Sequence, residues 1–487
     1  MLLFRYLFIA LVLVFAVPSA CLAAAQAAGG TKLTLAEAVQ LALANNIGLQ
    51  LQKDDVSSAE GAKEAAEGEF DVVAKGEGGA ESQEKTPLIP GESEEDKTAQ
   101  WAMGLQKKLT TGTEVSLNWT NSRFSSTPET TIFDPVYNTG LTLGLRQPLL
   151  QGFGTDRQTA AMRASEKNLA AATFMVSAEA ANLAAKVKNA YWNLVYAWQD
   201  KSVKELSLAL GQRLLAETEE KIRAGKLAPV DIYQPQSEVA RREESLISAD
   251  RAIGLYEDEL KLLVNSRDWH LPFIPADLPP TAGVEPDPQA VLENALRSRP
   301  DLQAAQLAID AARIQEEVAL DNTRPSLALV GLVGQGGTDD GYGDSMDDAV
   351  DNPKTQWQAG LAFSMPLQNS GAKGLHRQAS AAHNKAKNSA ELLRLQIQQS
   401  VRTTVRDVQL AQKTMEATKK TSLASSKRLE AEQEKFAVGR ATTFDVLTAQ
   451  EAYAKALSQE KQSEVGYAQA LAELDRIQGQ VTTGANL

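Results

Sequence analysis

Residues 221–232 of this chain read KIRAGKLAPVDI, and residues 435–446 read KFAVGRATTFDV. In both stretches a segment without proline ends at a glycine, which is a common stop signal for a helix, and the start of a new helix follows. The pattern therefore predicts a helical hairpin that occurs twice in the chain. The residues that match at the same spacing are Lys221 and Lys435, Gly225 and Gly439, Asp231 and Asp445, and Gln236 and Gln450.

A second pair of related segments lies upstream of the two hairpins. Residues 35–49 read LAEAVQLALANNIGL, and residues 289–302 read QAVLENALRSRPDL. Each segment opens an amphipathic helix, which we expect over about 34–68 and about 287–321. The chain is thus expected to be duplicated. Its parts are a first repeat, a linker and a second repeat with a short C-terminal tail, at residues 29–265, 266–286 and 287–487.

Strand-like sequence follows the first helix of each repeat. Apolar residues such as Trp357, Leu361 and Phe363 alternate with other residues, and a period of two suits a strand with lipid on one side. We expect the strands of a β-barrel within about 70–147 and about 326–365. The predicted strands are Phe70–Ser82, Gln100–Lys107, Thr113–Asn121, Asn138–Arg146, Ser326–Val333 and Thr355–Met365.

Two polar, charged segments interrupt these strands, at Glu81–Lys97 and Thr338–Asp351. Both are expected to be solvated loops, as is usual between the strands of outer-membrane barrels. The second segment is rich in aspartate, but its spacing matches no EF-hand, so no metal site is assigned.

Each set of strands is expected to pass into a helix through a junction with proline and glycine. Proline ends the hydrogen bonding of a strand, and glycine permits a sharp bend. The junction residues are Pro148, Gly152, Gly154, Pro366 and Gly371.

Each junction precedes a long stretch without proline, at about 155–223 and about 372–438. At about 1.5 Å per residue, each stretch predicts a helix roughly 100 Å long. Shorter return helices are expected at about 229–265 and about 442–478. The first helix and the return helix of a repeat together nearly equal the long helix, so they can stack end to end beside it. Each chain then supplies four helical columns, which calls for several identical chains around one axis.

Composition argues against several functional classes. The formal net charge of -13 is unsuited to a nucleic-acid-binding protein, which needs clustered basic residues. One cysteine and three histidines permit no intrachain disulfide and make a Cys/His metal site untenable. We find no nucleophile or nucleotide-binding motif, so no catalytic residue, no cofactor and no enzyme activity are expected. After residue 28 the chain lacks an apolar run of about 18 residues, so a membrane-embedded mature chain would need strands closed into a barrel.

Residues 1–28 have the layout of a secretory signal peptide. Arg5 precedes an apolar run from Tyr6 to Val17, and an Ala-rich stretch follows. Cys21 allows two interpretations: it is removed with the signal, or cleavage before it exposes it as a lipidation site.

Several of these features resemble the TolC-like outer membrane efflux protein (outer membrane factor) family. They are the duplicated helix–strand–helix plan, the junction QPLLQGFG at residues 147–154, and Val438–Arg440 followed by Phe444–Leu447. The resemblance covers nearly the whole mature chain. It implies an α+β membrane protein, a trimeric transmembrane β-barrel continuous with a long periplasmic α-helical barrel, built from two structural repeats per chain.

The resemblance also implies partners and a location. It places a homotrimer in the lipid of the cell outer membrane, with a long periplasmic extension. There it would meet a periplasmic adaptor (membrane fusion) protein and an inner-membrane RND or ABC transporter. The first repeat holds two more predicted strands than the second. This extra hairpin, at about 100–121, either enlarges the barrel beyond twelve strands or folds outside it.

Members of the family tend to place carboxylates just inside a closed periplasmic tip. On this pattern the gate candidates are Asp445, its counterpart Asp231, and Thr448, which stands where some members have a second acidic residue. Both aspartates also fit ordinary capping at a helix start, so capping alone and gating in addition both stay open. The residues for adaptor contact would be Arg223, Gly225, Lys226, Val438, Gly439 and Arg440.

The sequence therefore favours the outer-membrane exit duct of a tripartite efflux system, which passes small molecules to the exterior. A protein cargo is an alternative within the same class, with the chain as the outer-membrane component of a type I secretion system. An alternative from another class is a periplasm-spanning structural coiled coil or adhesin without a pore. The strand junctions and the duplication disfavour that last interpretation.

Overall fold

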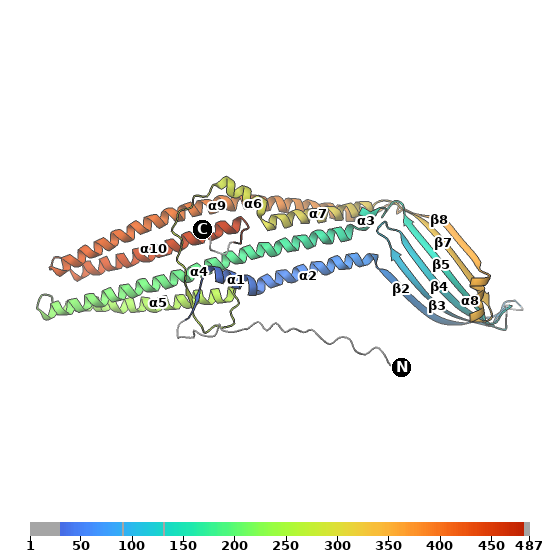
Figure 1. Ribbon diagram of the computed structural model, residues 1–487, viewed down its shortest axis with the longest axis horizontal. Helices are drawn as coiled ribbons and strands as arrows, with labels where there is room; N and C mark the ends of the chain where they lie inside the picture. Colours follow the sequence, from blue (N-terminus) through green and yellow to red (C-terminus); the bar gives the residue numbers. More distant parts are fainter. Residues whose placement is uncertain (1–29, 90–91, 130–131, 482–487) are drawn as a thin grey trace, which may run out of the picture.

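The computed structural model describes residues 30–89, 92–129 and 132–481. It shows an elongated chain with helices at one end and a single large sheet at the other (Figure 1). The predicted signal peptide, Cys21 and the last residues of the C-terminal tail lie outside the described residues. None of the described helices combines the length and the apolar composition that a membrane crossing requires.

Two long helices form the axis of the molecule. Helix α4 (Ala160–Arg223) follows the four-residue helix α3 (Thr155–Gln158), and helix α9 (Ser370–Ala437) has 68 residues. Their returns are α5 (Tyr233–Leu263) and α10 (Thr443–Ile477). A 3-10 turn, η2 (Pro229–Ile232), precedes α5, because Pro229 sets the first turn without needing a backbone donor.

The first helix of each repeat is broken, which corrects the expectation of continuous helices over about 34–68 and 287–321. Asn46 is extended between α1 (Leu35–Asn45) and α2 (Ile47–Glu67), and its side chain accepts a hydrogen bond from the Leu49 N–H at 3.1 Å. Arg299 is extended between α6 (Pro288–Ser298) and α7 (Pro300–Asp321), because a residue before proline is disfavoured in the helical region.

The helices lie side by side as four columns. Helix α4 contacts α2 along one part of its length and α5 along the other, and on its opposite side it contacts α7 and α10. Helix α9 then lies against α7 and α10. Two short helices thus accompany each long one, in the order α2/α5, α4, α7/α10, α9. Apolar side chains at three- to four-residue spacing, such as Val187, Tyr191 and Leu194, fill the contacts.

The linker between the repeats contributes a small two-stranded sheet. Strand β6 (Phe273–Pro275) pairs in parallel with β1 (Thr31–Leu33) beside the middle of α4. The fully buried Tyr191 fastens this sheet, since its hydroxyl donates to the Leu33 carbonyl at 3.0 Å. Tyr467 on α10 does the same for the rest of the linker, where its hydroxyl donates to the Ala282 carbonyl at 2.9 Å.

The large sheet has six antiparallel strands in the order β2-β3-β4-β5-β7-β8. Most of them extend further than the sequence predicted, into the polar segment Glu81–Lys97 among others. A short 3-10 turn, η1 (Gly68–Phe70), leads from α2 into the first strand. The strands are β2 (Val72–Glu84), β3 (Glu95–Lys108), β4 (Glu114–Thr127), β5 (Val136–Pro148), β7 (Ser326–Asp339) and β8 (Lys354–Ser364).

The acidic segment Thr338–Asp351 is not a simple loop, and this expectation is corrected. Its second part forms helix α8 (Tyr342–Asp351), which lies against β5 and β7. Small residues allow this contact: a Cβ atom on Gly337 would lie only 2.2 Å from the carbonyl oxygen of Ser345. The Ser345 hydroxyl is hydrogen-bonded to that of Thr139 at 3.0 Å, so the helix is fixed to the sheet.

Candidate functional site

The two hairpin turns lie together at the end of the molecule opposite the sheet (Figure 1). In the first, Gly225 has a φ of +73°, and the Lys226 N–H donates to the Lys221 carbonyl at 2.8 Å. In the second, Gly439 has a φ of +75°, and the Arg440 N–H donates to the Lys435 carbonyl at 2.7 Å. Both turns end a helix in the same way, with glycine in the left-handed conformation.

The gate candidates Asp231 and Asp445 each cap the helix that follows them. The Asp445 carboxylate accepts the Thr442 N–H at 2.8 Å and the Thr442 hydroxyl at 2.6 Å, which completes a capping box. The Asp231 carboxylate accepts the Ala228 N–H at 3.0 Å. The third candidate, Thr448, is exposed and donates its hydroxyl to the Phe444 carbonyl within its own helix.

Capping also shifts the acidity of Asp445. The hydrogen bonds from the Thr442 hydroxyl and backbone lower the pKa of this carboxyl below its usual value, because both favour the charged form. The side chain is therefore an anion at neutral pH. All of these contacts lie within a single turn, between Thr442 and Asp445.

The contact that joins the two hairpins at the tip was not predicted from the sequence. The Lys221 ammonium on α4 lies 3.2 Å from the centroid of the Phe436 ring on α9 and donates to the Phe436 carbonyl. Burial lowers the pKa of Lys221. Phe436 belongs to a small buried cluster that spans both hairpins, together with Leu214, Val446 and Leu447. The duplication gives a partial signal, since Ile222 stands in the first repeat where Phe436 stands in the second.

A buried arginine forms a second connection between the hairpins, further from the tip. Arg242 on α5 is 5% exposed and donates to the Ser207 carbonyl of α4 at 2.6 Å and to the Gln450 amide oxygen of α10 at 2.9 Å. Its guanidinium also pairs with Glu238 at 2.9 Å. It fits beside Gly211, where a Cβ atom would lie 2.9 Å from its Nη1. Three helices are therefore held by one side chain.

The predicted adaptor-contact residues lie on the outer surface of the tip. The exposed side chains there include Arg223, Lys226, Val438 and Arg440, next to the exposed backbone of the two turn glycines. Large apolar side chains that the sequence analysis missed are exposed beside them. These are Val230, Tyr233 and Phe444. Exposed apolar residues among basic ones are typical of a surface that binds a protein partner.

The strand-to-helix junctions lie at the other end of the helices. Pro148 ends β5, and Gly152 and Gly154 have φ angles of +77° and +97°. In the second junction the left-handed residue is Asn369, with a φ of +51°, whereas Gly371 lies inside helix α9. Asparagine tolerates this conformation better than most residues, so the bend expected from Gly371 is supplied by Asn369 instead.

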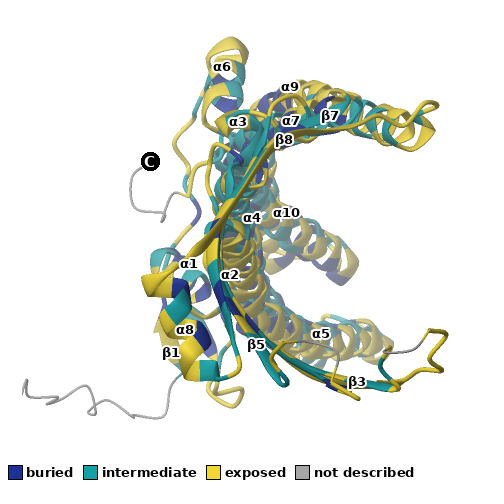
Figure 2. Ribbon diagram, turned by 90° about the vertical axis from the view of Figure 1, so that its right-hand side faces the viewer, coloured by how far each residue is buried: buried dark blue, intermediate teal, exposed yellow. Residues whose placement is uncertain are grey.

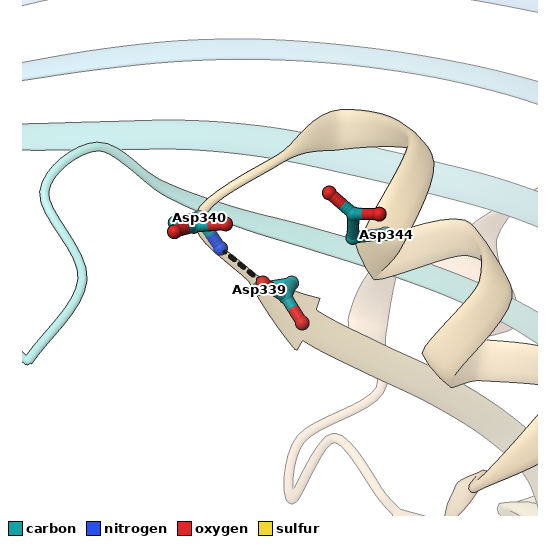
Figure 3. A group of neighbouring side chains, drawn as sticks. All are labelled: Asp339, Asp340 and Asp344. Carbon is teal, nitrogen blue, oxygen red and sulfur yellow. Dashed lines mark hydrogen bonds between the residues drawn. The ribbon is translucent and has the colours of Figure 1, made fainter.

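Three carboxylates gather at the far end of the sheet, where β7 passes into α8 (Figure 3). Asp339, Asp340 and Asp344 place oxygen atoms within 4.8 Å of one another, and the Asp340 N–H donates to Asp339 at 2.7 Å. A hydrogen bond with the Asp339 side chain raises the pKa of Asp340. Asp340 and Asp344 are exposed, and acidity alone does not make this group a metal site.

Comparison with known proteins shows which family and which relative this sequence resembles. The family model described as "Outer membrane efflux protein" matches residues 291–480. The outer membrane efflux protein BepC of Brucella suis is 25% identical over 325 residues. That alignment covers 64% of this chain and 66% of BepC, slightly less than two thirds of its length.

Solved structures share the fold. The outer-membrane channel OprN superposes with a TM-score of 0.69 at 19% identity, over 91% of this chain and 89% of that one. The outer membrane protein VceC of Vibrio cholerae gives a TM-score of 0.66 at 18% identity, over 92% and 96%. At these identities the likeness shows a common fold.

The matched family and the curated relative consist of outer-membrane efflux proteins, so the predicted outer-membrane location is confirmed, and so is the prediction that this chain is not an enzyme. The fold is confirmed at the level of TolC-like channels with mixed helix and sheet. Over residues 291–480 the chain matches the outer membrane efflux protein family, and its fold is that of the solved outer-membrane channels.

Proposed function

We propose that three copies of this chain form the outer-membrane exit duct of a tripartite efflux system. The duct would pass small molecules from a periplasmic adaptor and an inner-membrane RND or ABC pump to the exterior. The sheet would lie in the outer membrane as part of a closed barrel, and the helices would form a tunnel wall in the periplasm.

The shape of the single chain carries this proposal. Viewed along the long axis, the sheet and most of the helices follow one arc, and α10 lies on its concave side (Figure 2). The outermost elements of this wall expose large apolar side chains, including Ile247 and Leu255 on α5 and Leu410 and Leu423 on α9. A wall with an exposed, partly apolar surface at both edges can close when identical walls meet around one axis.

The tip of this wall has the parts that a closable end needs. Each hairpin can move as a unit, since its two helices pack along their length, whereas a few contacts join one hairpin to the other at the tip. The Lys221–Phe436 contact is one of these, and the Arg242 cluster joins the hairpins further from the tip. Asp231 and Asp445 would assist by fixing the start of each return helix at the constriction.

The exposed residues of the turns would bind the adaptor. Arg223, Lys226 and Arg440 supply positive charge, and Val438 adds an apolar contact beside the left-handed turn glycines. An acidic and partly apolar partner surface would complement them.

Particle imaging and bilayer recording test the proposal together. The detergent-extracted protein should appear as a three-fold elongated tube, and it should form discrete conducting channels in a planar bilayer. A monomeric particle, or a trimer without conductance, would contradict the duct. The second result would favour a structural role without a pore.

A further inference from the structure

The first repeat contributes four strands to the sheet and the second repeat two, and the extra pair lies inside the sheet. Strand β3 is paired along its length with β2 on one side and with β4 on the other, and β4 is likewise paired with β5. Because β2 is attached to the sheet only through β3, the hairpin is an integral part of the wall.

The register aligns apolar residues of all six strands in a row on one face. One row of directly paired residues runs across the sheet, and the hairpin supplies its second and third members. This row consists of Ala74, Leu105, Leu117, Leu143, Val333 and Trp357. In an antiparallel sheet, residues paired in this way point to the same side. The hairpin thus continues the apolar face of its neighbours without interruption.

The opposite face carries a polar row across the same strands. A neighbouring row, shifted by one residue, has polar or glycine residues on every strand, and the hairpin again follows the pattern. Its members are Lys75, Gly104, Asn118, Thr142, Gly334 and Gln356. This face lines a polar concavity of about 830 Å³ that includes Thr98, Gln100 and Thr120 of the hairpin.

The width of the sheet matches that of the helices only when all six strands are counted. Strands about 4.8 Å apart and tilted by about 40° give six strands a width of roughly 38 Å along the wall. Four helices about 9 Å apart span roughly 36 Å, whereas four strands would span only about 25 Å. The wall can therefore continue from helices to strands without narrowing.

The two edge strands are suited to pair with each other between chains. Within the described chain, β2 and β8 are each paired on one side only. The strands alternate in direction across the sheet, so β2 and β8 run in opposite directions. An unpaired edge is costly in lipid, because its backbone groups find no water there. A second copy of the chain offers the complementary edge.

We propose that each chain inserts all six strands, so that β8 of one copy pairs with β2 of the next and three copies close an eighteen-stranded barrel. The apolar face of the extra hairpin contacts the acyl chains of the membrane, and its polar face lines the lumen. This inference rests on the proposed trimeric duct. The inference goes beyond the proposed duct because it assigns the extra hairpin to the barrel wall.

Spin labels on adjacent residues test the inference in liposomes. The full chain contains one cysteine, Cys21, so a Cys21→Ala background allows single labels to be introduced. Leu117→Cys and Asn118→Cys probe the two faces of the hairpin. Leu361→Cys and Gly360→Cys are the matched pair on β8, which belongs to the sheet in either arrangement. Collision with oxygen reports lipid, and collision with a water-soluble nickel chelate reports the lumen.

We expect the Leu117 label to be reached by oxygen and the Asn118 label by the nickel chelate, as for the Leu361 and Gly360 pair. A lipid-exposed Leu361 label with a water-exposed Leu117 label would overturn the inference and leave the duct standing. A Leu361 label exposed only to water would overturn the duct itself, and the inference with it. A variant that fails to give trimers is replaced by a label at Leu105, which shares the row of Leu117.

Discussion

The ammonium group of Lys221 lies over the ring of Phe436, 3.2 Å from its centroid, and so joins the two hairpins at the tip of the molecule. Each hairpin is also stabilised within itself, by its turn and by the packing of its two helices. A contact between the hairpins differs from a contact inside one of them. Its loss leaves both hairpins folded and changes only their relative position. This makes the pair a sensitive probe of tip closure.

Lys221→Met should weaken the closed arrangement of the tip. Methionine keeps the length of the side chain but removes the charge, and a cation–π contact of this kind is worth about 1 kcal/mol. A change of that size raises the ratio of open to closed channels about fivefold. Recordings of the purified protein in planar bilayers measure this ratio directly. Phe436→Leu should have a similar effect.

The matched control for Lys221 is Lys420→Met on α9, an exposed lysine away from the tip. It should leave the open fraction unchanged. The double variant Lys221→Met/Phe436→Leu tests the contact itself. If its change in the free energy of closure equals the sum of the changes in the two single variants, the residues act independently and the contact has no part in closure.

The Asp445 cap should survive until the solution is strongly acidic. Its pKa is lowered in the folded chain, so the cap stabilises α10 above the usual pKa of 3.8 and is lost as pH falls through the lowered value. Between pH 8 and pH 5 we therefore expect constant amide protection at the start of α10. Hydrogen exchange measures it, and Asp445→Ala should lack this protection at every pH. Equal amide protection in the variant and in the native chain would show that the Asp445 cap does not stabilise the start of α10.

The architecture could be derived from the sequence because it depends on length and period. The stretches without proline predict the two long helices. The duplicated turns predict the return helices, since glycine at a helix end indicates the left-handed conformation that ends a helix. The breaks at Asn46 and Arg299 were missed because an amphipathic pattern continues across them. At both breaks a single extended residue stands at the N-cap position of the next helix, and Asn46 also caps that helix with its side chain.

The contacts at the tip could not be derived in the same way. Lys221 and Phe436 are 215 residues apart, and periodicity says which face of a helix is apolar but not which helix it meets. Helix α8 was missed for a related reason. Its aspartates are typical of a solvated loop, while the glycine that lets it lie on the sheet, Gly337, is on a different element.

Arg242→Met should destabilise the helical wall by about 2–3 kcal/mol, because the charged hydrogen bonds to Ser207 and Gln450 are lost in a buried position. Burial raises the pKa of its partner Glu238, but hydrogen bonds from Arg241 and Arg242 outweigh this effect and the net pKa is lowered. The native pair thus stabilises above the usual pKa of 4.5, and its contribution is lost as the pH falls through the lowered value.

Arg241→Met is the matched control for Arg242, since the two arginines are adjacent and share Glu238. Arg241 is more than half exposed, so its ion pairs should contribute under about 1 kcal/mol. Thermal unfolding followed by circular dichroism compares the two variants. Equal losses would show that burial of Arg242 adds nothing.

Asp321→Asn should loosen the junction where the strands of the first repeat become helix. The native carboxylate on α7 accepts the Gly152 N–H at 2.7 Å and pairs with Arg157 and Arg324, each at 3.1 Å. Asparagine can still accept from Gly152 but cannot neutralise the arginines, so a loss of about 2 kcal/mol is expected. Hydrogen exchange across residues 149–158 should rise about tenfold or more, while exchange at the tip stays unchanged. Asp258→Asn, an exposed aspartate on α5, should change neither region. A uniform rise along the whole chain would mean that Asp321 supports global stability and does not hold this junction in particular.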